Sequence, residues 1–201
     1  MAVDVDIDVE VLKFEIKKTY ARVSEEPEQE FIFPTGRAWA LDLGYPADLL
    51  ARVPDGAAES FAGVANPFRL GRLATGERVL DLGSGAGMDS LVATQMVGPE
   101  GAVTGIDMTP EMLAKARSAA SEMGVSNVEF FEGEVESLPF EDETFDVVIS
   151  NGVIDLAPDK DAVFSEIHRV LRPGGRIQIA DVTIQNPVSE EGRRKIDLWT
   201  G

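Results

Sequence analysis

The chain has 201 residues, 44% of them hydrophobic and 27% charged, and its formal net charge is −18 at pH 7. This composition is typical of a globular protein, and the excess of carboxylates disfavours nucleic acids and anionic membrane surfaces as partners. No cysteine is present, which excludes disulfides and thiolate metal sites, and no metal site is expected. There is no apolar run of membrane-spanning length and no secretion signal, so we expect a cytoplasmic protein.

The N-terminal part is predicted to form an extension followed by a cap. Residues 3–9 alternate apolar and acidic side chains, which is the period of a β-strand, and from Val11 to Tyr20 the apolar side chains fall at helical spacing. We therefore predict a strand and helix extension over residues 1–30, with an acidic linker over residues 24–29. Residues 31–74 contain many glycines and prolines between short apolar segments, which predicts a cap or lid of short helices and loops.

From residue 75 to residue 201, segments with strand and helix patterns alternate. Strands are expected at 78–82, 102–107, 127–132, 145–150 and 176–181, and helices at about 87–97, 110–123, 159–171 and 189–199. Thr109 is expected to cap the start of a helix and Gly124 its end, while Pro173-Gly174-Gly175 is predicted to be a turn before the last strand. The alternation predicts an α/β fold with a doubly wound, mostly parallel Rossmann-like sheet.

A glycine-rich turn follows the first of these strands. Gly83, Gly85 and Gly87 separate the strand that ends in Leu82 from a helix whose apolar residues begin at Met88. Glycines let backbone N–H groups approach a bound group closely, and the N-terminus of the helix lies behind them. The pattern predicts a site for a nucleotide-like cofactor. The alternative is a tight strand-to-helix connection without a ligand.

Two aspartates help to choose between cofactors. Asp107 ends the second expected strand, 20 residues after Gly87, where a carboxylate can accept hydrogen bonds from both hydroxyls of a ribose. Asp81 precedes the turn, where its charge would repel a pyrophosphate and attract a sulfonium cofactor with an amino-acid tail. The G-x-G-x-G spacing also disfavours a dinucleotide. A dinucleotide-dependent oxidoreductase stays an alternative, as does a helix-capping role for Asp107.

Four motifs, taken in chain order, resemble those of class I S-adenosylmethionine-dependent methyltransferases: Asp81 to Gly87, Asp107, Leu138 to Val148, and Arg169 to Gly175. Within that superfamily, residues 60–68 (SFAGVANPF) and 150–160 (SNGVIDLAPDK) resemble the arsenite methyltransferase-like branch. The resemblance covers about residues 15–200. It implies a methyltransferase sheet, S-adenosylmethionine as cofactor, and transfer of a methyl group to a small molecule.

The resemblance also implies positions for the cofactor. The methionine and ribose portions are expected to lie against the residues of the glycine turn, Gly83, Ser84, Gly85 and Gly87. Asp81 is expected to hold the amino-acid end, directly or through water, and Asp107 the ribose hydroxyls. Met108 is expected to pack on the adenine, with Glu134 and Val135 at the adenine edge.

Two further positions are implied near the reacting methyl group. Asn151 follows the fourth strand, where the methyl-transfer pocket opens in the family; the alternative is that it is a turn residue. Tyr20 resembles the tyrosine of a family Tyr-Gly pair near the methionine of the cofactor, although Ala21 replaces the glycine. No catalytic base is assigned, because in-line transfer from a sulfonium depends on alignment and water exclusion more than on acid–base groups.

The chain departs from the arsenite methyltransferase-like branch because it has no cysteine. Arsenite methylation in that branch uses cysteine thiolates, and the position after the fourth strand that would carry one is Gly152 here. We therefore expect a small-molecule methyltransferase whose substrate is unassigned. A non-catalytic or truncated S-adenosylmethionine-binding domain is the second hypothesis, and an arsenite methyltransferase is the third.

The C-terminal part also departs from the family pattern. Class I methyltransferases usually add two strands after the fifth, and no counterpart of that C-terminal strand pair is recognised in this sequence. The fifth strand would then form an open sheet edge, which proteins normally cover. We expect residues 3–9 to pair with this edge, within one subunit or across a homodimer; the alternative is a charged disordered tail or a truncated product.

Overall fold

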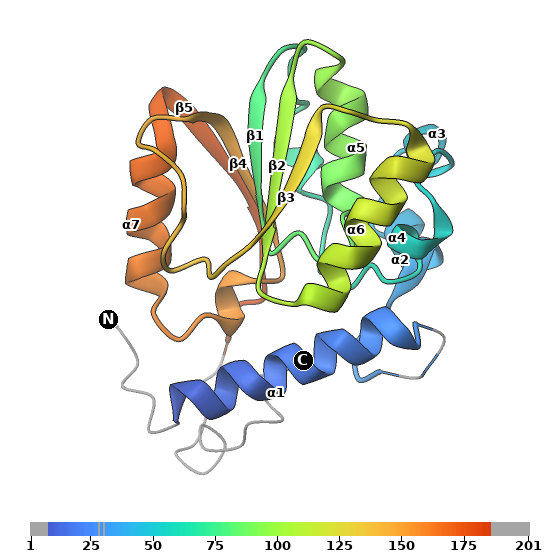
Figure 1. The fold of residues 1–201 in the computed structure, drawn as a ribbon, viewed down its shortest axis with the longest axis vertical. Helices are drawn as coiled ribbons and strands as arrows, with labels where there is room; N and C mark the ends of the chain where they lie inside the picture. The colour runs from blue at the N-terminus through green and yellow to red at the C-terminus, as the bar shows by residue number, and fades with distance from the viewer. Residues whose placement is uncertain (1–7, 28, 30, 186–201) are drawn as a thin grey trace.

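The computed structural model describes residues 8–27, 29 and 31–185. Its centre is a five-stranded parallel sheet with the strand order β3-β2-β1-β4-β5 (Figure 1). The strands are β1 (Arg78–Leu82), β2 (Ala102–Asp107), β3 (Val128–Glu132), β4 (Phe145–Asn151) and β5 (Leu171–Ala180). On one face lie the helices α5 (Met88–Val97) and α6 (Pro110–Met123), and on the other lies α7 (Lys160–Val170). The predicted doubly wound α/β fold is confirmed.

Successive residues of the central strands face opposite sides of the sheet. Val147 belongs to the apolar cluster shared with α5 and α6, whereas Val148 belongs to the cluster shared with α7, and both are fully buried. This explains the continuous apolar run of β4, because a parallel sheet covered on both faces needs no polar alternation. The helix α5 is itself buried along nearly its whole length, since it lies between the sheet and α3 (Ala47–Leu50).

Apart from the last strand, the strands and helices that the sequence predicts between residues 78 and 171 lie within one residue of their expected positions. Both residues predicted to cap α6 flank this helix. Thr109 precedes it in an extended conformation, but its side chain makes no capping hydrogen bond. Pro110 lies in the first turn, and Gly124 ends the helix in the left-handed conformation at φ +69°.

The last strand begins earlier than predicted. β5 starts at Leu171, directly after α7, and it contains Pro173-Gly174-Gly175, so the prediction of a separate turn is wrong. The register against β4 shifts between Phe145 and Val147, and Gly174 has a φ of +83°. Because glycine adopts this backbone conformation without strain, the strand accommodates an irregularity there and continues.

The N-terminal helix also differs from the expectation. α1 (Val9–Glu25) begins at a residue assigned to the strand and includes Ser24, which was assigned to the linker. The side chain of Asp8 explains the start, because it accepts hydrogen bonds from the N–H groups of Glu10 (3.0 Å) and Val11 (3.3 Å). The strand prediction is therefore wrong for Asp8 and Val9. Its other residues, like the helix expected at 189–199, lie outside the described residues.

Short helices and loops occupy the segment that was predicted to form the cap. They are α2 (Gly36–Asp42), α3, α4 (Asp55–Ala58) and the 3₁₀ helix η1 (Pro67–Leu70). Arg37 links three of these pieces, because its Nη2 donates to the carbonyl of Val53 (2.8 Å) and to Asp55 Oδ1 (2.7 Å), and its Nη1 donates to the carbonyl of Leu50. The function of this segment as a lid stays a prediction.

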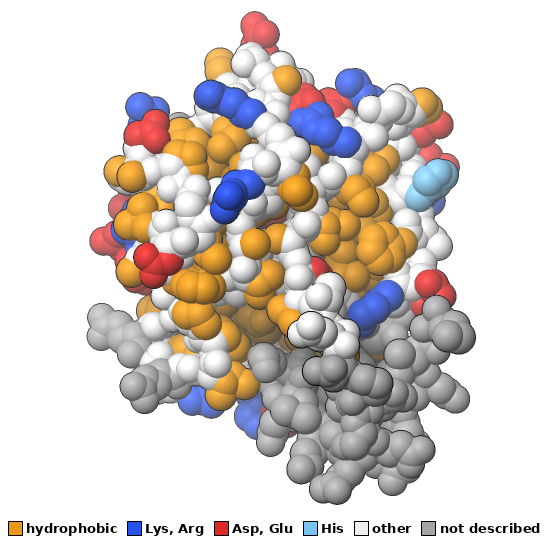
Figure 2. All heavy atoms as spheres, turned by 180° about the vertical axis from the view of Figure 1, so that it is seen from behind, with side chains coloured by type: hydrophobic (Ala, Val, Ile, Leu, Met, Phe, Trp, Pro, Cys, Tyr) orange, Lys and Arg blue, Asp and Glu red, His pale blue; other side chains and the backbone are white. Residues whose placement is uncertain are grey.

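Within the described residues, β5 lies at the edge of the sheet, and Ile177 on this strand is 48% exposed. Figure 2 shows apolar side chains gathered on the face that includes His168 of α7, drawn in pale blue. The pairing of residues 3–9 or of a second copy with β5 stays a prediction. None of the helices in the described ranges is long and apolar enough to cross a membrane.

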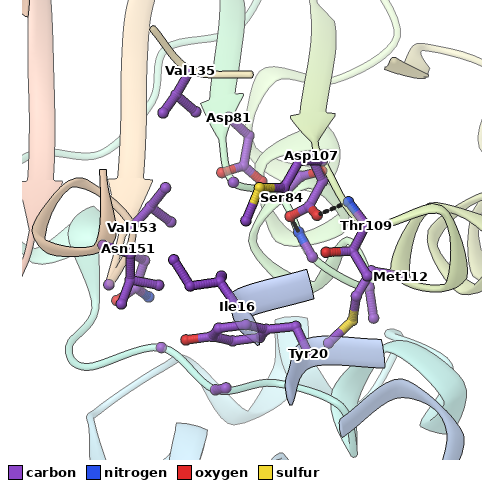
Figure 3. A pocket seen from close by; sticks show the side chains of 18 of the residues that line it. Ile16, Tyr20, Asp81, Ser84, Asp107, Thr109, Met112, Val135, Asn151 and Val153 are labelled. Carbon is purple, nitrogen blue, oxygen red and sulfur yellow. Dashed lines mark hydrogen bonds between the residues drawn. The ribbon is translucent and has the colours of Figure 1, made fainter. Parts of the chain in front are cut away.

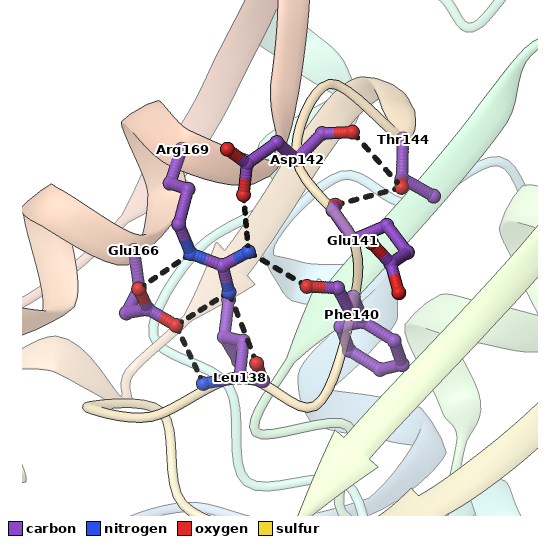
Figure 4. Close-up of polar contacts among 7 residues, drawn as sticks. All are labelled: Leu138, Phe140, Glu141, Asp142, Thr144, Glu166 and Arg169. Atoms are coloured by element: carbon purple, nitrogen blue, oxygen red, sulfur yellow. Dashed lines mark hydrogen bonds and ion pairs between the residues drawn. The ribbon is translucent and has the colours of Figure 1, made fainter.

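The guanidinium group of Arg169, on α7, contacts the segment between β3 and β4 at several points (Figure 4). Arg169 donates to the carbonyls of Leu138 (3.0 Å) and Phe140 (2.7 Å), and to the carboxylates of Asp142 (2.9 Å) and Glu166 (2.7 Å). Arginine suits this position because its planar group presents several donors in fixed directions.

We expect Arg169→Lys to lower the free energy of unfolding by about 2 kcal/mol, because an ammonium group cannot reach all of these acceptors. Denaturant unfolding measures the loss. Arg69→Lys is the matched control, since Arg69 is exposed on η1. Equal stability of Arg169→Lys and Arg69→Lys would contradict the role given to this network.

Candidate functional site

A pocket lies at the carboxyl ends of the central strands, where α1 covers it (Figure 3). β2 and β4 lie on opposite sides of β1, and ligands of doubly wound proteins bind at such a switch point. Of the predicted cofactor residues, only Gly87 does not line this pocket. Those that do are Tyr20, Asp81, Gly83, Ser84, Gly85, Asp107, Met108, Glu134, Val135 and Asn151.

The glycine turn forms one wall of the pocket. Gly83 and Gly85 have φ angles of +65° and +52°, and a Cβ added at Gly83 would lie 2.3 Å from a methyl group of Val153. Both the backbone conformation and the close contact therefore require glycine at position 83. Gly87, at φ +87°, precedes α5 and packs against Ala116 and Phe130, which explains why it does not reach the pocket.

Asp107 connects this turn to α6. Its Oδ2 accepts a hydrogen bond from the Gly85 N–H (2.9 Å), and its Oδ1 accepts one from the Thr109 N–H (2.8 Å) (Figure 3). Burial raises the pKa of this carboxyl, and the backbone hydrogen bonds oppose that rise. Asp107 thus supports the start of α6 and also lines the pocket, so the two roles considered from the sequence are compatible.

The pocket contains a second buried aspartate, which the sequence analysis did not identify. Asp89, in the first turn of α5, is 7% exposed, and Asp81 is 2% exposed. Asp89 Oδ1 accepts from the hydroxyl of Tyr45 (2.5 Å), and Asp81 Oδ2 accepts from the hydroxyl of Ser90 (2.6 Å). Burial raises the pKa of both carboxyls, that of Asp89 to about 6. The only signal in the sequence is that Asp89 follows the glycine turn directly within the next helix.

The side chain of Asn151 is fully engaged by the protein. Its Oδ1 accepts from the N–H groups of Val64 (2.8 Å) and Ala65 (3.2 Å). Its Nδ2 donates to Asp89 Oδ2 (3.0 Å), to the Ala65 carbonyl (2.8 Å) and to the Tyr45 hydroxyl (3.0 Å). Asn151 lines the pocket, and its amide joins the end of β4 to residues 64–65 and to α5.

The helix α1 contributes Lys13, Ile16 and Tyr20 to the pocket. Lys13 Nζ lies 2.7 Å from Glu134 Oε2 and 3.9 Å from Glu136 Oε1, so the helix is paired with the loop that follows β3. The ring of Tyr20 stacks on Phe33 with 6.0 Å between centroids, and burial raises the pKa of its hydroxyl, which therefore keeps its proton at neutral pH. The contacts of Lys13 and Tyr20 thus hold α1 in place over the pocket at two points.

Comparison with known proteins agrees with this geometry. A family model described as a methyltransferase domain matches residues 73–199. The arsenite methyltransferase of Halobacterium salinarum is 50% identical over 159 residues, which are 79% of this chain and 40% of that protein. A demethylmenaquinone methyltransferase of Listeria monocytogenes is 36% identical over 119 residues, which are 59% of this chain and 50% of that protein.

The solved structure of an arsenic(III) S-adenosylmethionine methyltransferase from Chlamydomonas reinhardtii matches with a TM-score of 0.67 at 44% identity, over 72% of this chain and 50% of that one. The fold and the glycine turn at the switch point define an α/β protein of the class that binds nucleotide-type cofactors. More particularly, the chain belongs to the methyltransferase domain family, and S-adenosylmethionine is the cofactor that this membership assigns to it. The chain spans about two fifths of the length of the H. salinarum relative.

Proposed function

We propose that this chain binds S-adenosylmethionine in the pocket beneath α1 and transfers the methyl group of this cofactor to a small molecule. The observation that carries the proposal is that the glycine turn, Asp81 and Asp107 meet in one pocket. S-adenosylmethionine has a ribose, a flat aromatic base and an ammonium group, and this pocket offers a group for each.

The polar groups of the pocket fit this cofactor. Ser84 Oγ is buried and has no hydrogen-bond partner among the described residues, which supports contact with a polar ligand group. Asp107 uses each oxygen for one backbone N–H, which leaves lone pairs for two ribose hydroxyls. Asp81 would face the amino-acid end, and Met108 and Val135 would pack against the adenine.

The bound cofactor would supply a methyl group on a positively charged sulfur, which is electrophilic without acid catalysis. The protein would then have to align the acceptor with that methyl group and exclude water. Ile16 and Tyr20 of α1 cover the pocket, and the amide of Asn151 holds residues 64–65 against its wall. No side chain is assigned as a base, and an acceptor that carries a proton, such as a hydroxyl, amine or thiol, would lose that proton to solvent.

We propose that the methyl acceptor is a small molecule that, unlike arsenite, needs no thiolate ligand from the protein. Gly152, at the position of the missing cysteine, lines the pocket and has a φ of +69°. A cysteine side chain at this position would be strained in the present backbone. Arsenite is the alternative acceptor, because the H. salinarum and C. reinhardtii relatives act on arsenic, as their names state.

Methyl transfer from radiolabelled S-adenosylmethionine to a panel of acceptors tests this proposal. The panel should contain hydroxyl, amine, thiol and quinol acceptors, with arsenite added alone and with excess glutathione. Label in a small-molecule acceptor is expected. Tight cofactor binding without transfer to any acceptor would support a non-catalytic or truncated binding domain.

Lys13→Gln is expected to weaken cofactor binding about fivefold, because it removes a partly buried ion pair that holds α1 over the pocket and is worth about 1 kcal/mol. Equilibrium titration with S-adenosylmethionine measures the change. The matched control is Lys18→Gln, which removes an ion pair of Lys18 with Glu15 inside the same helix. If both variants bind like the unchanged protein, α1 does not limit access to the pocket.

A further inference from the structure

The charge of the pocket is unbalanced. Its lining contains five carboxylates and one ammonium group, Asp81, Asp89, Asp107, Glu134, Glu136 and Lys13. Lys13 is paired with the two glutamates. Over the described ranges, no lysine or arginine forms an ion pair with Asp81 or Asp89, whose hydrogen-bond donors are the neutral side chains of Ser90, Tyr45 and Asn151.

We propose that Asp89 is a cofactor-recognition residue, which forms with Asp81 a paired-carboxylate site for the ammonium group at the amino-acid end of the cofactor. Entry of that positive charge displaces one proton from the pair into solvent. This inference rests on the proposed function, because it takes S-adenosylmethionine as the ligand. Beyond that function, Asp89 is assigned to the cofactor site as a second carboxylate, and cofactor binding is expected to release a proton.

A proton is expected on this pair because both carboxylates are buried and carry like charge. Two carboxylates that share a buried site without a cation cannot both ionise at little cost. Asp89 accepts hydrogen bonds on both oxygens, which stabilise its charged form. Burial and then the charge of Asp89 raise the pKa of Asp81, so we assign the proton of the pair to Asp81.

The groups that face this pair do not supply the missing positive charge. Asp107 adds a further negative charge beside Asp81, and burial raises the pKa of the Tyr45 hydroxyl, which stays neutral. Ser84 provides an independent sign of a ligand, because this residue is only 8% exposed and lines the same pocket, and its buried hydroxyl has no hydrogen-bond partner among the described residues. An ammonium group at this end would replace the proton of Asp81 and leave both carboxylates ionised.

Titration calorimetry in buffers of different ionisation enthalpy measures the proton directly. For S-adenosylmethionine near neutral pH, we expect the observed heat to depend on the buffer with a slope of about one proton released per bound molecule. Binding should tighten as pH rises towards the pKa of Asp81 in the empty pocket, by up to about tenfold per pH unit. 5′-Methylthioadenosine lacks the charged end, and its heat of binding should not depend on the buffer.

Asp89→Asn tests the residue itself. The substitution removes the like charge that adds to the effect of burial on Asp81, so the buffer dependence should fall below that of the unchanged protein, and affinity should fall about tenfold as one carboxylate is lost. Tyr45→Phe disturbs the same hydrogen-bond network without changing its charge and should keep the proton release. Asp48→Asn, on the exposed surface of α3, is the matched control and should behave like the unchanged protein.

The outcomes separate this inference from the proposed function. Binding of S-adenosylmethionine by the unchanged protein with a buffer-independent heat would overturn the proton release, whether or not the variants fold. Undiminished proton release in folded Asp89→Asn would overturn the role of Asp89. Absence of binding by S-adenosylmethionine and by its demethylated product would contradict the proposed function instead.

Discussion

Replacing Asp107 with alanine is expected to weaken S-adenosylmethionine binding by about 100-fold or more. Removing the carboxylate would delete the hydrogen bonds that we propose it makes to the ribose hydroxyls, and it would release the N–H groups of Gly85 and Thr109, which it holds in the described structure. Hydrogen bonds to a charged group contribute about 1.5 to 3 kcal/mol each, so the loss of two accounts for a change of this size. Equilibrium titration of the purified variant measures it.

Two further substitutions show whether the loss of binding is specific to the carboxylate of Asp107. Asp107→Asn keeps one acceptor oxygen and should give an intermediate affinity. Glu111→Ala removes an exposed carboxylate from the first turn of the same helix and should leave binding unchanged. If folded Asp107→Ala bound the cofactor as well as Glu111→Ala, Asp107 would not hold the ribose.

Asn151→Ala is expected to lower the free energy of unfolding by about 3 kcal/mol, or the melting temperature by about 10 °C. The amide of Asn151 satisfies two backbone N–H groups in residues 64–65 and donates to the buried carboxylate of Asp89. Without it, these groups are left unpaired in a part-buried region, which is the costly case for a lost hydrogen bond. Thermal unfolding and denaturant unfolding both measure the effect.

Asn127→Ala is the matched control. Asn127 is also part-buried, but its amide donates to the carbonyls of Gly98 (2.9 Å) and Gly101 (3.4 Å), which lie between α5 and the start of β2, at the end of the sheet opposite to the pocket. Its loss should cost about 1 kcal/mol and leave cofactor binding intact. Equal stability of the two alanine variants would show that Asn151 does not anchor residues 64–65.

The parts of the site that could be predicted from the sequence are those set by local geometry. The glycine turn and Asp107 lie at the ends of strands whose apolar runs are unmistakable, and parallel strands bring their carboxyl ends together. Prediction was weaker where one side chain decides the boundary. The carboxylate of Asp8 starts α1 at Val9 despite the alternating pattern, and Gly174 lets β5 continue through the expected turn.

The Asp89 network could not be predicted because it needs three distant segments to meet. Tyr45 follows α2, Asp89 lies in α5 and Asn151 ends β4, and no pattern within any one segment identifies the other two. Asn151 was assigned to the pocket by resemblance alone, which did not reveal that its amide is engaged by residues 64–65. Such contacts depend on tertiary packing and become visible only in the folded chain.

The most direct measurement is titration calorimetry of the purified chain with S-adenosylmethionine, its demethylated product and NADH. If the pocket beneath α1 is an S-adenosylmethionine site, the first two ligands should bind saturably at one site per chain, and NADH should give no heat of binding. Failure of both S-adenosylmethionine and its product to bind, or saturable binding of NADH in their place, would contradict the assignment.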